Sequence, residues 1–289
     1  MIIIKNIFEL RNVLNRTRAK GKTIGFVPTM GAFHEGHLSL MRVAKKDNDL
    51  CVVSIYVNPT QFGPKDDFKK YPRDLQRDSS MAKKENVDIL FVPSDNVIYS
   101  KSYLTYIDVK NISQPLCGRF RPGHFKGVAT VVAKLLNIVQ PDVMYLGQKD
   151  AQQVAVLKKM VEDLNFPVKV SVVATRRETD GLAMSSRNKY LSPQDRQEAV
   201  VLYKALQQAI RMIQKGERSQ AKIKAAIRFL ITSQSSGEIQ YVECVDADNL
   251  AELKRLQGNV LIALAVFFGK TRLIDNVFIR LHEPKQNKS

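Results

Sequence analysis

Short apolar runs alternate with amphipathic segments along residues 1–176. Five runs have the length and residue types of buried strands: 23–28, 50–57, 88–92, 142–146 and 168–174. Between them, segments 37–44 and 151–164 carry apolar residues at the 3.6-residue spacing of a helix. This rhythm predicts a doubly wound α/β domain with a parallel sheet, whose ligands bind in the loops beyond the carboxyl ends of the strands.

The pattern changes after residue 176. Ser192-Pro193 supplies an N-cap and a first-turn proline to a long helix ending near Gly216, and 223–231 indicates a second helix. Three strands follow at 239–245, 260–268 and 271–281, the last two joined by a hairpin turn at Gly269-Lys270. Residues 177–289 therefore form a smaller α+β C-terminal domain, which could close as a lid, with a disordered tail at 283–289.

Composition narrows the class of protein. With 44% hydrophobic residues in 289 the chain can build a core, and it carries neither an export signal nor a 20-residue apolar run, so we expect a cytoplasmic protein with no membrane partner. Three scattered cysteines predict reduced thiols. The net charge of +17 is spread along the chain, which favours a solvated surface that attracts small anions, with nucleic-acid binding as the alternative.

The most informative segment is Pro28-Thr29-Met30-Gly31-Ala32-Phe33-His34-Glu35-Gly36-His37, between a predicted strand and a predicted helix. Its glycines permit a tight turn, and a helix start offers N–H groups and a positive dipole end to an anion. Two imidazoles there can donate to phosphate oxygens as charge develops on a leaving pyrophosphate. The alternatives are a metal pair, for which we find no third ligand, and two ordinary surface histidines.

The element His34-Glu35-Gly36-His37 resembles the His-x-Gly-His motif of the nucleotidylyltransferase and class I aminoacyl-tRNA synthetase superfamily, whose fold is Rossmann-like. The segment Asp180-Gly181-Leu182-Ala183-Met184-Ser185-Ser186-Arg187-Asn188 resembles that superfamily's Lys-Met-Ser-Lys-Ser loop. Hydroxyls and a planar guanidinium suit a phosphate clamp.

Four further segments resemble the pantothenate synthetase family, in the family's order. They are Val57-Asn58-Pro59-Thr60-Gln61-Phe62, Tyr71-Pro72-Arg73, Arg121-Pro122-Gly123-His124-Phe125 and Gly147-Gln148-Lys149-Asp150-Ala151-Gln152-Gln153. Thr60 departs from the methionine common in the family. The resemblance implies an ATP- and Mg²⁺-dependent ligase, a homodimer that does not bind nucleic acid, which joins (R)-pantoate to β-alanine through a pantoyl-adenylate and releases AMP and pyrophosphate.

The resemblance also implies roles for individual residues. The ATP contacts it implies are Met30, Gly31, Ala32, Phe33, His34, Glu35, Gly36, His37, Gly147, Gln148, Lys149, Asp150, Arg176, Met184, Ser185, Ser186 and Arg187. The expected catalytic residues are His34, His37, Lys149, Ser185, Ser186 and Arg187, with His37 as a proton donor. The expected contacts to pantoate or β-alanine are Asn58, Gln61, Arg121, His124 and Gln153, and Asp78 is a candidate Mg²⁺ ligand.

Two rival functions stay open from the sequence. A nucleotidylyltransferase acting on a phosphorylated metabolite would share the two superfamily elements but would not need both Gln61 and Gln153. A basic RNA-binding module could keep the charge without an intact ATP site, yet the sequence has no aromatic-rich stacking platform.

Overall fold

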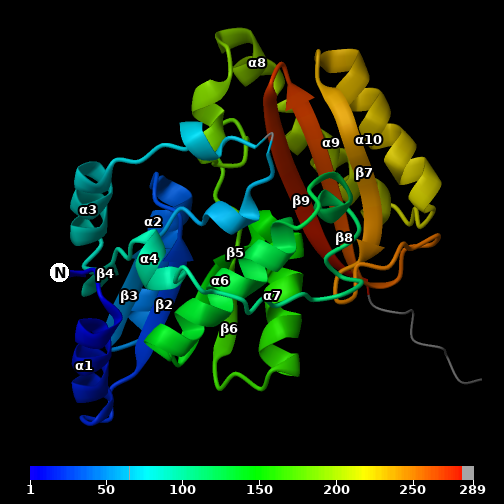
Figure 1. Cartoon of the computed structure of the whole chain (residues 1–289). Helices are drawn as coiled ribbons and strands as arrows, with labels where there is room; N and C mark the ends of the chain where they lie inside the picture. The colour runs from blue at the N-terminus through cyan, green and yellow to red at the C-terminus, as the bar shows by residue number, and fades with distance from the viewer. Residues whose placement is uncertain (65, 282–289) are drawn as a thin grey trace, which may run out of the picture. The chain divides into compact units, whose positions relative to one another are not determined.

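The computed structural model describes residues 1–64 and 66–281; the tail predicted to be disordered lies outside them. The chain divides into two compact units (Figure 1). Unit 1 comprises Met1–Gln114, Gly118–Gln148 and Val156–Arg176, and unit 2 comprises Pro115–Cys117, Lys149–Ala155 and the chain from Arg177 onward.

Unit 1 is built on a six-stranded sheet in the order β1-β4-β3-β2-β5-β6, with every recorded pairing parallel. The strands are β1 (Ile2–Ile4), β2 (Ile24–Thr29), β3 (Leu50–Ile55), β4 (Ile89–Phe91), β5 (Val143–Gly147) and β6 (Lys169–Val173). The doubly wound α/β prediction and its five strands are confirmed. Strand β1 was not predicted, because three residues at a sheet edge, two of them exposed isoleucines, give no period to detect.

Helix α2 packs on β2, β3 and β5 beside α3, while α1 packs beside α6, which contacts β2 (Figure 1). The helices from the start of the chain through α7 are α1 (Ile7–Arg18), α2 (Glu35–Asp47), α3 (Leu75–Lys84), α4 (Asp95–Ile98), α5 (Cys117–Phe120), α6 (His124–Val139) and α7 (Ala151–Asp163). The 3₁₀ turns are η1 (Pro59–Gln61), η2 (Phe68–Lys70), η3 (Gln148–Asp150) and η4 (Ser186–Tyr190). Under α2 lies a core that includes Phe33, Met41, Val53 and Tyr145.

The strand order places a topological switch point between β2 and β5. From β2 the chain goes on to β3 and β4 on one side, and β5 later pairs with the other side of β2 and leads to β6. A crevice at the carboxyl ends of two such strands is where doubly wound sheets bind ligands. The turn after β2 leads to the two histidines at the start of α2, and the Gly-Gln-Lys-Asp segment begins at the last residue of β5 and continues into η3.

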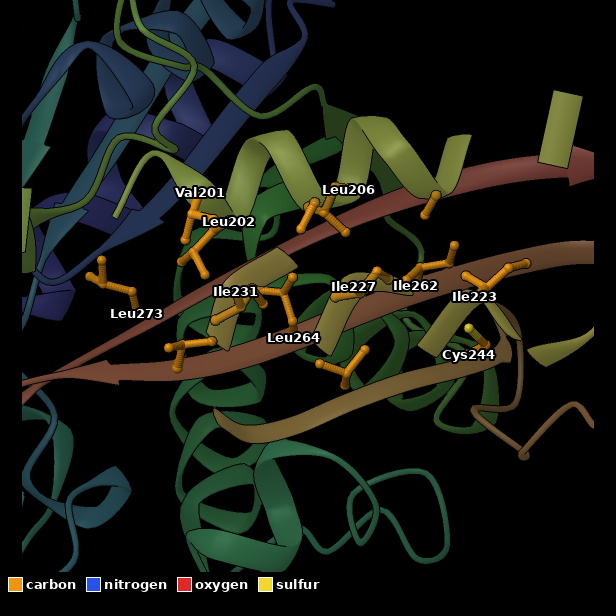
Figure 2. Close-up of a cluster of buried hydrophobic side chains, with 14 of the residues drawn as sticks. Val201, Leu202, Leu206, Ile223, Ile227, Ile231, Cys244, Ile262, Leu264 and Leu273 are labelled. Carbon is orange, nitrogen blue, oxygen red and sulfur yellow. The ribbon is translucent and has the colours of Figure 1, made fainter. Parts of the chain in front are cut away.

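Unit 2 is an antiparallel sheet of β7 (Glu238–Asp246), β8 (Gly258–Phe268) and β9 (Thr271–Leu281), with α9 (Val201–Gln214) and α10 (Gln220–Gln234) packed on it. Figure 2 shows Leu206 of α9 and Ile227 of α10 in one cluster with Ile262 and Leu264 of β8. The predicted strands, hairpin and helix end at Gly216 (φ 95°) are confirmed.

The single long helix predicted from Ser192 is wrong, since α8 (Pro193–Glu198) ends before α9 begins. Ala199, Val201 and Leu202 are all buried, although positions 199 and 201 of a continuous helix would point about 200° apart. The break lets all three face the core. Among the described residues, no helix is long and apolar enough to cross a membrane.

Candidate active site

The turn after β2 has an unusual backbone. Gly31 (φ 81°) and Ala32 (φ 54°) are successive residues in the left-handed region. A Cβ on Gly31 would lie 2.9 Å from Oδ2 of Asp78 and 3.1 Å from Cγ2 of Ile55, so glycine is required by space as well as by conformation. Thr29 Oγ1 accepts from the Gly31 amide at 3.1 Å.

Asp78 of α3 is the side chain that holds this turn. It is 1% exposed, and its Oδ2 accepts from the amide of Ala32 at 2.7 Å while Oδ1 accepts from the amide of Phe33 at 2.9 Å. A Mg²⁺ ligand needs a carboxylate oxygen turned to the ion, and both oxygens are here turned to backbone amides. These bonds favour a structural role for Asp78 over the predicted metal role. The described residues hold no group of three or more metal-ligating side chains.

His34 and His37 form a reciprocal cap at the start of α2. Nδ1 of His34 accepts from the Gly36 amide at 3.2 Å, and Nδ1 of His37 accepts from the His34 amide at 3.3 Å. An Nδ1 that accepts carries no proton, so a neutral imidazole in either place has its proton on Nε2. The rings lie 4.1 Å apart between centroids. The cap thus sets two Nε2–H donors at the positive end of a helix dipole.

Glu35 lies between the histidines and is paired with Arg42, which also binds Glu85. The pKa of Glu35 is lowered, chiefly by its hydrogen bond from Arg42, with a smaller contribution from the charge of Arg176. Glu35 is therefore an anion held by Arg42. Through Arg42, Glu35 links the start of α2 to Glu85, which is a structural role.

Asn58 and Gln61 lie in the turn after β3 and are both buried. Nδ2 of Asn58 donates to Gln61 Oε1 at 3.0 Å and to the carbonyl of Gly127 at 3.1 Å. Its Oδ1 accepts from the hydroxyls of Thr60 (2.9 Å) and Tyr99 (3.0 Å). Burial raises the pKa of Tyr99 to about 12, so its hydroxyl stays protonated as a donor. Asn58 is thus occupied in holding Gln61.

Arg121 and His124 also support Gln61. Nη2 of Arg121 and Nδ1 of His124 donate to the Gln61 carbonyl at 3.3 and 2.8 Å, and Arg121 pairs with Asp66 at 2.7 Å. The segment Arg121-Pro122-Gly123 leads directly into the 16-residue helix α6, which begins at His124. In unit 1, therefore, four of the predicted substrate residues form one hydrogen-bonded group around Gln61.

The segment after β5 contributes residues to unit 2. Lys149 and Asp150 lie in η3, and Gln153 is half-buried in the first turn of α7. Its neighbour Gln152 is buried and bonds the Cys117 amide (2.9 Å) and the Pro115 carbonyl (2.7 Å), which is a structural role. The backbone carbonyl of Lys149 accepts from Nδ2 of Asn276 at 2.8 Å.

Side-chain hydrogen bonds and ion pairs hold the serine-rich segment of unit 2, residues 180–188, in place. Asn188 donates to Glu178 Oε1 (2.8 Å) and to the Ala183 carbonyl (3.1 Å), and Arg196 binds Glu178 and Asp180. Ser185 Oγ accepts from the Arg187 amide at 3.2 Å. This holds Met184, Ser185, Ser186 and Arg187 in a defined, half-buried turn.

The sequence motifs did not indicate three residues that take part in these contacts. They are Thr60, as a hydrogen-bonding partner, Tyr99 and Asn276. Tyr99 and Asn276 act across 41 and 127 residues of sequence, respectively. The one signal available for Asn276 was the polar pair Asp275-Asn276 between the apolar residues Leu273-Ile274 and Val277-Phe278-Ile279 of a predicted strand.

A parallel doubly wound sheet with a capped histidine pair at its switch point defines a nucleotide-binding α/β enzyme. The family model described as pantoate-beta-alanine ligase matches residues 2–278. The chain belongs to this ligase family.

Relatives support the assignment over nearly the full length. The pantothenate synthetase of Caldicellulosiruptor saccharolyticus is 51% identical, with 97% of this chain and 100% of the relative covered. The crystal structure of pantothenate synthetase from Thermus thermophilus matches with a TM-score of 0.91 and 41% identity, covering 96% of this chain and 99% of that one. The Francisella tularensis ligase, complexed with βγ ATP and β-alanine, matches with a TM-score of 0.78 and 38% identity, covering 96% and 97%.

Proposed function

We propose that the protein condenses (R)-pantoate with β-alanine through a pantoyl-adenylate, consuming ATP and releasing AMP and pyrophosphate. The observation that carries the proposal is the reciprocal cap of His34 and His37, which sets two Nε2–H donors at the start of α2. The Francisella relative's complex with a form of ATP and β-alanine supports the choice of substrates.

In the first step, a carboxylate oxygen of pantoate attacks the α-phosphorus of ATP in line and the bond to pyrophosphate breaks. Negative charge grows on the leaving pyrophosphate, and the two imidazole N–H groups stabilise it more strongly than they stabilise bound ATP. Mg²⁺ enters as part of the Mg-ATP substrate, without Asp78 as a ligand. His37 donates the second of these hydrogen bonds.

In the second step, the amine of β-alanine attacks the carbonyl carbon of the mixed anhydride. The C–N bond forms, the C–O bond to AMP breaks with its electron pair going to the AMP phosphate, and the nitrogen loses a proton to solvent to give the amide of pantothenate. The chemistry needs no covalent enzyme intermediate, so orientation and charge stabilisation are the protein's contributions.

Further roles follow from the family resemblance. We assign Lys149 to the α-phosphate, Asp150 to the ribose hydroxyls, and Ser185, Ser186 and Arg187 to the triphosphate. Arg176 and the backbone of the glycine-containing segments, including Gly147 and Gln148, complete the ATP contacts.

We assign Gln61 and Gln153 to the hydroxyls and carboxylate of pantoate. Asn58, Arg121 and His124 support this function through their bonds to Gln61. The same proposal includes a homodimer in the cytoplasm, without nucleic-acid or membrane partners. It also includes a role for residues 177–289 as a lid.

The test is isotope exchange between pyrophosphate and ATP. Pantoate plus Mg-ATP should support exchange without β-alanine, while net AMP formation should require both substrates. Exchange that needs β-alanine but not pantoate would refute the order of steps. Exchange with a phosphorylated metabolite in place of pantoate would favour the nucleotidylyltransferase alternative.

A further inference from the structure

Two adjacent polar residues, Asp275 and Asn276, interrupt the run of apolar residues in the middle of strand β9 in unit 2. They are 2% and 5% exposed and pair with Leu264 and Ala263 of β8. A buried carboxylate and a buried amide are unfavourable in a sheet unless both are bonded. Because successive residues of a strand point to opposite faces, the two side chains act on different neighbours.

Asp275 shares its face with Leu273 and Val277, which belong to the core under α9 and α10. There it receives two hydrogen bonds from Arg177, at 2.6 and 3.0 Å, and its Oδ1 also accepts from the Asn276 amide at 2.8 Å. The Arg177 guanidinium lies 4.7 Å from the ring centre of Tyr203. These contacts hold the backbone of β9 at Asp275, directly before Asn276.

Asn276 points to the other face of the sheet, where Nδ2 donates to the backbone carbonyl of Lys149 at 2.8 Å. That carbonyl lies in η3, between the end of β5 and the start of α7. A bond to it holds the peptide plane between Lys149 and Asp150, and so restricts the backbone from which the lysine side chain extends.

We propose that Asn276 is a positioning residue that sets the Lys149 side chain for its part in adenylate formation. The inference rests on the proposed function, because it takes Lys149 as the residue that carries charge to the α-phosphate. A charge that must meet a developing transition state loses much of its effect when it is displaced by about 1 Å. Asp275, held by Arg177, keeps the strand and the asparagine in place.

The test compares variants of the full chain in single-turnover formation of pantoyl-adenylate at saturating ATP and pantoate. The variants are Asn276→Ala, Lys149→Ala, the double variant, and the control Asn259→Ala. Asn259 lies on neighbouring β8 and bonds Asp248 and Arg280, so its loss removes an asparagine of the same sheet that does not contact Lys149. Melting temperature and ATP affinity are measured alongside.

Asn276→Ala should slow adenylate formation about tenfold with a smaller change in ATP affinity, while Asn259→Ala should stay near the parental rate. The double variant should be no slower than Lys149→Ala, since the asparagine acts only through the lysine. The inference would be overturned if the rate reductions of the two single variants multiplied in the double variant. Equal rates of adenylate formation for Asn276→Ala and Asn259→Ala would also overturn it. If the alanine variant does not fold, near-isosteric Asn276→Leu, which removes the donor without burying a charge, should reproduce the loss.

Failure of the proposed function gives a different result. If the parental chain forms no pantoyl-adenylate, or if Lys149→Ala forms it at the parental rate, the fault lies in the proposed reaction or in the role of the lysine. If Lys149→Ala is slow and Asn276→Ala is not, the reaction stands and only the positioning role is wrong.

Discussion

The side-chain amide of Asn58 donates a 3.0 Å hydrogen bond to Oε1 of Gln61. This bond fixes which end of the glutamine amide is the acceptor, and Nε2 lies 3.1 Å from the sulfur of Met30. The glutamine is therefore presented with a defined polarity, and its amide nitrogen is the group that can donate to a hydroxyl or carboxylate of the acid substrate.

Truncating this pair, or the second glutamine Gln153, should damage the pantoate step. Gln61→Ala, Asn58→Ala and Gln153→Ala should each lower kcat/KM for pantoate by a factor equivalent to about 1–3 kcal/mol of activation free energy, because polar groups lose their partners. Varying pantoate at saturating ATP measures this. Gln194→Ala is the control, since it removes an exposed glutamine whose side chain bonds Glu198 in another part of the chain. An equal loss of ATP affinity in the glutamine variants would count against this placement.

The sequence predicts the parallel sheet because buried strands and amphipathic helices have strong periods. It predicts neither the break at Ala199 nor the edge strand β1, since both depend on which neighbours a few residues pack against. The histidine turn is recognisable from its motif. The function of Asp78 is not, because an acid in a polar helix gives no sign that two amides of a distant turn face it.

Asp78→Asn tests the structural role of this carboxylate. An NH₂ group must then face the amide of Ala32 or Phe33, so we expect a loss of about 1–3 kcal/mol in unfolding free energy. The activity that remains should show the parental dependence on Mg²⁺ concentration. Asp74→Asn, at the N-cap of the same helix, is the matched control, because asparagine is an equally good cap. A much higher Mg²⁺ requirement in Asp78→Asn alone would restore the metal role.

The ion pair of Arg177 with Asp275 predicts a large loss of stability. Arg177→Met leaves a carboxylate that is 2% exposed without its partner, which should lower the unfolding free energy by about 3–5 kcal/mol. Replacing both residues, as in Arg177→Met with Asp275→Leu, should recover much of that loss. Urea unfolding measures both effects. Lys159→Met, in an exposed pair with Asp163, should leave the midpoint unchanged.

Buried thiols predict a loss of stability at alkaline pH. Burial is the main cause that raises the pKa of both Cys51 and Cys244 to about 12, above the ordinary thiol value of about 8.5. The unfolded chain therefore releases these protons first. The stabilisation is complete below about pH 8.5 and falls by roughly 1.4 kcal/mol per pH unit per thiol as the pH rises toward 12. Urea unfolding between pH 8 and 10 should show a shallower decline in Cys244→Ala.

The last prediction separates the two nitrogens of His37. Nδ1 accepts from the His34 amide, while Nε2 carries the proton that we assign to the leaving pyrophosphate. His37→Ala should slow single-turnover adenylate formation about a hundredfold or more, with a smaller change in ATP affinity, and Lys149→Ala should behave similarly. In His37→Asn, the amide oxygen can replace Nδ1 in the cap but nothing replaces Nε2, so the fold should keep its stability and the rate should stay low. His37→Gln places a donor near the Nε2 position and should recover part of the rate. A His37→Asn enzyme that forms pantoyl-adenylate at the parental rate would show that the histidine only caps the helix.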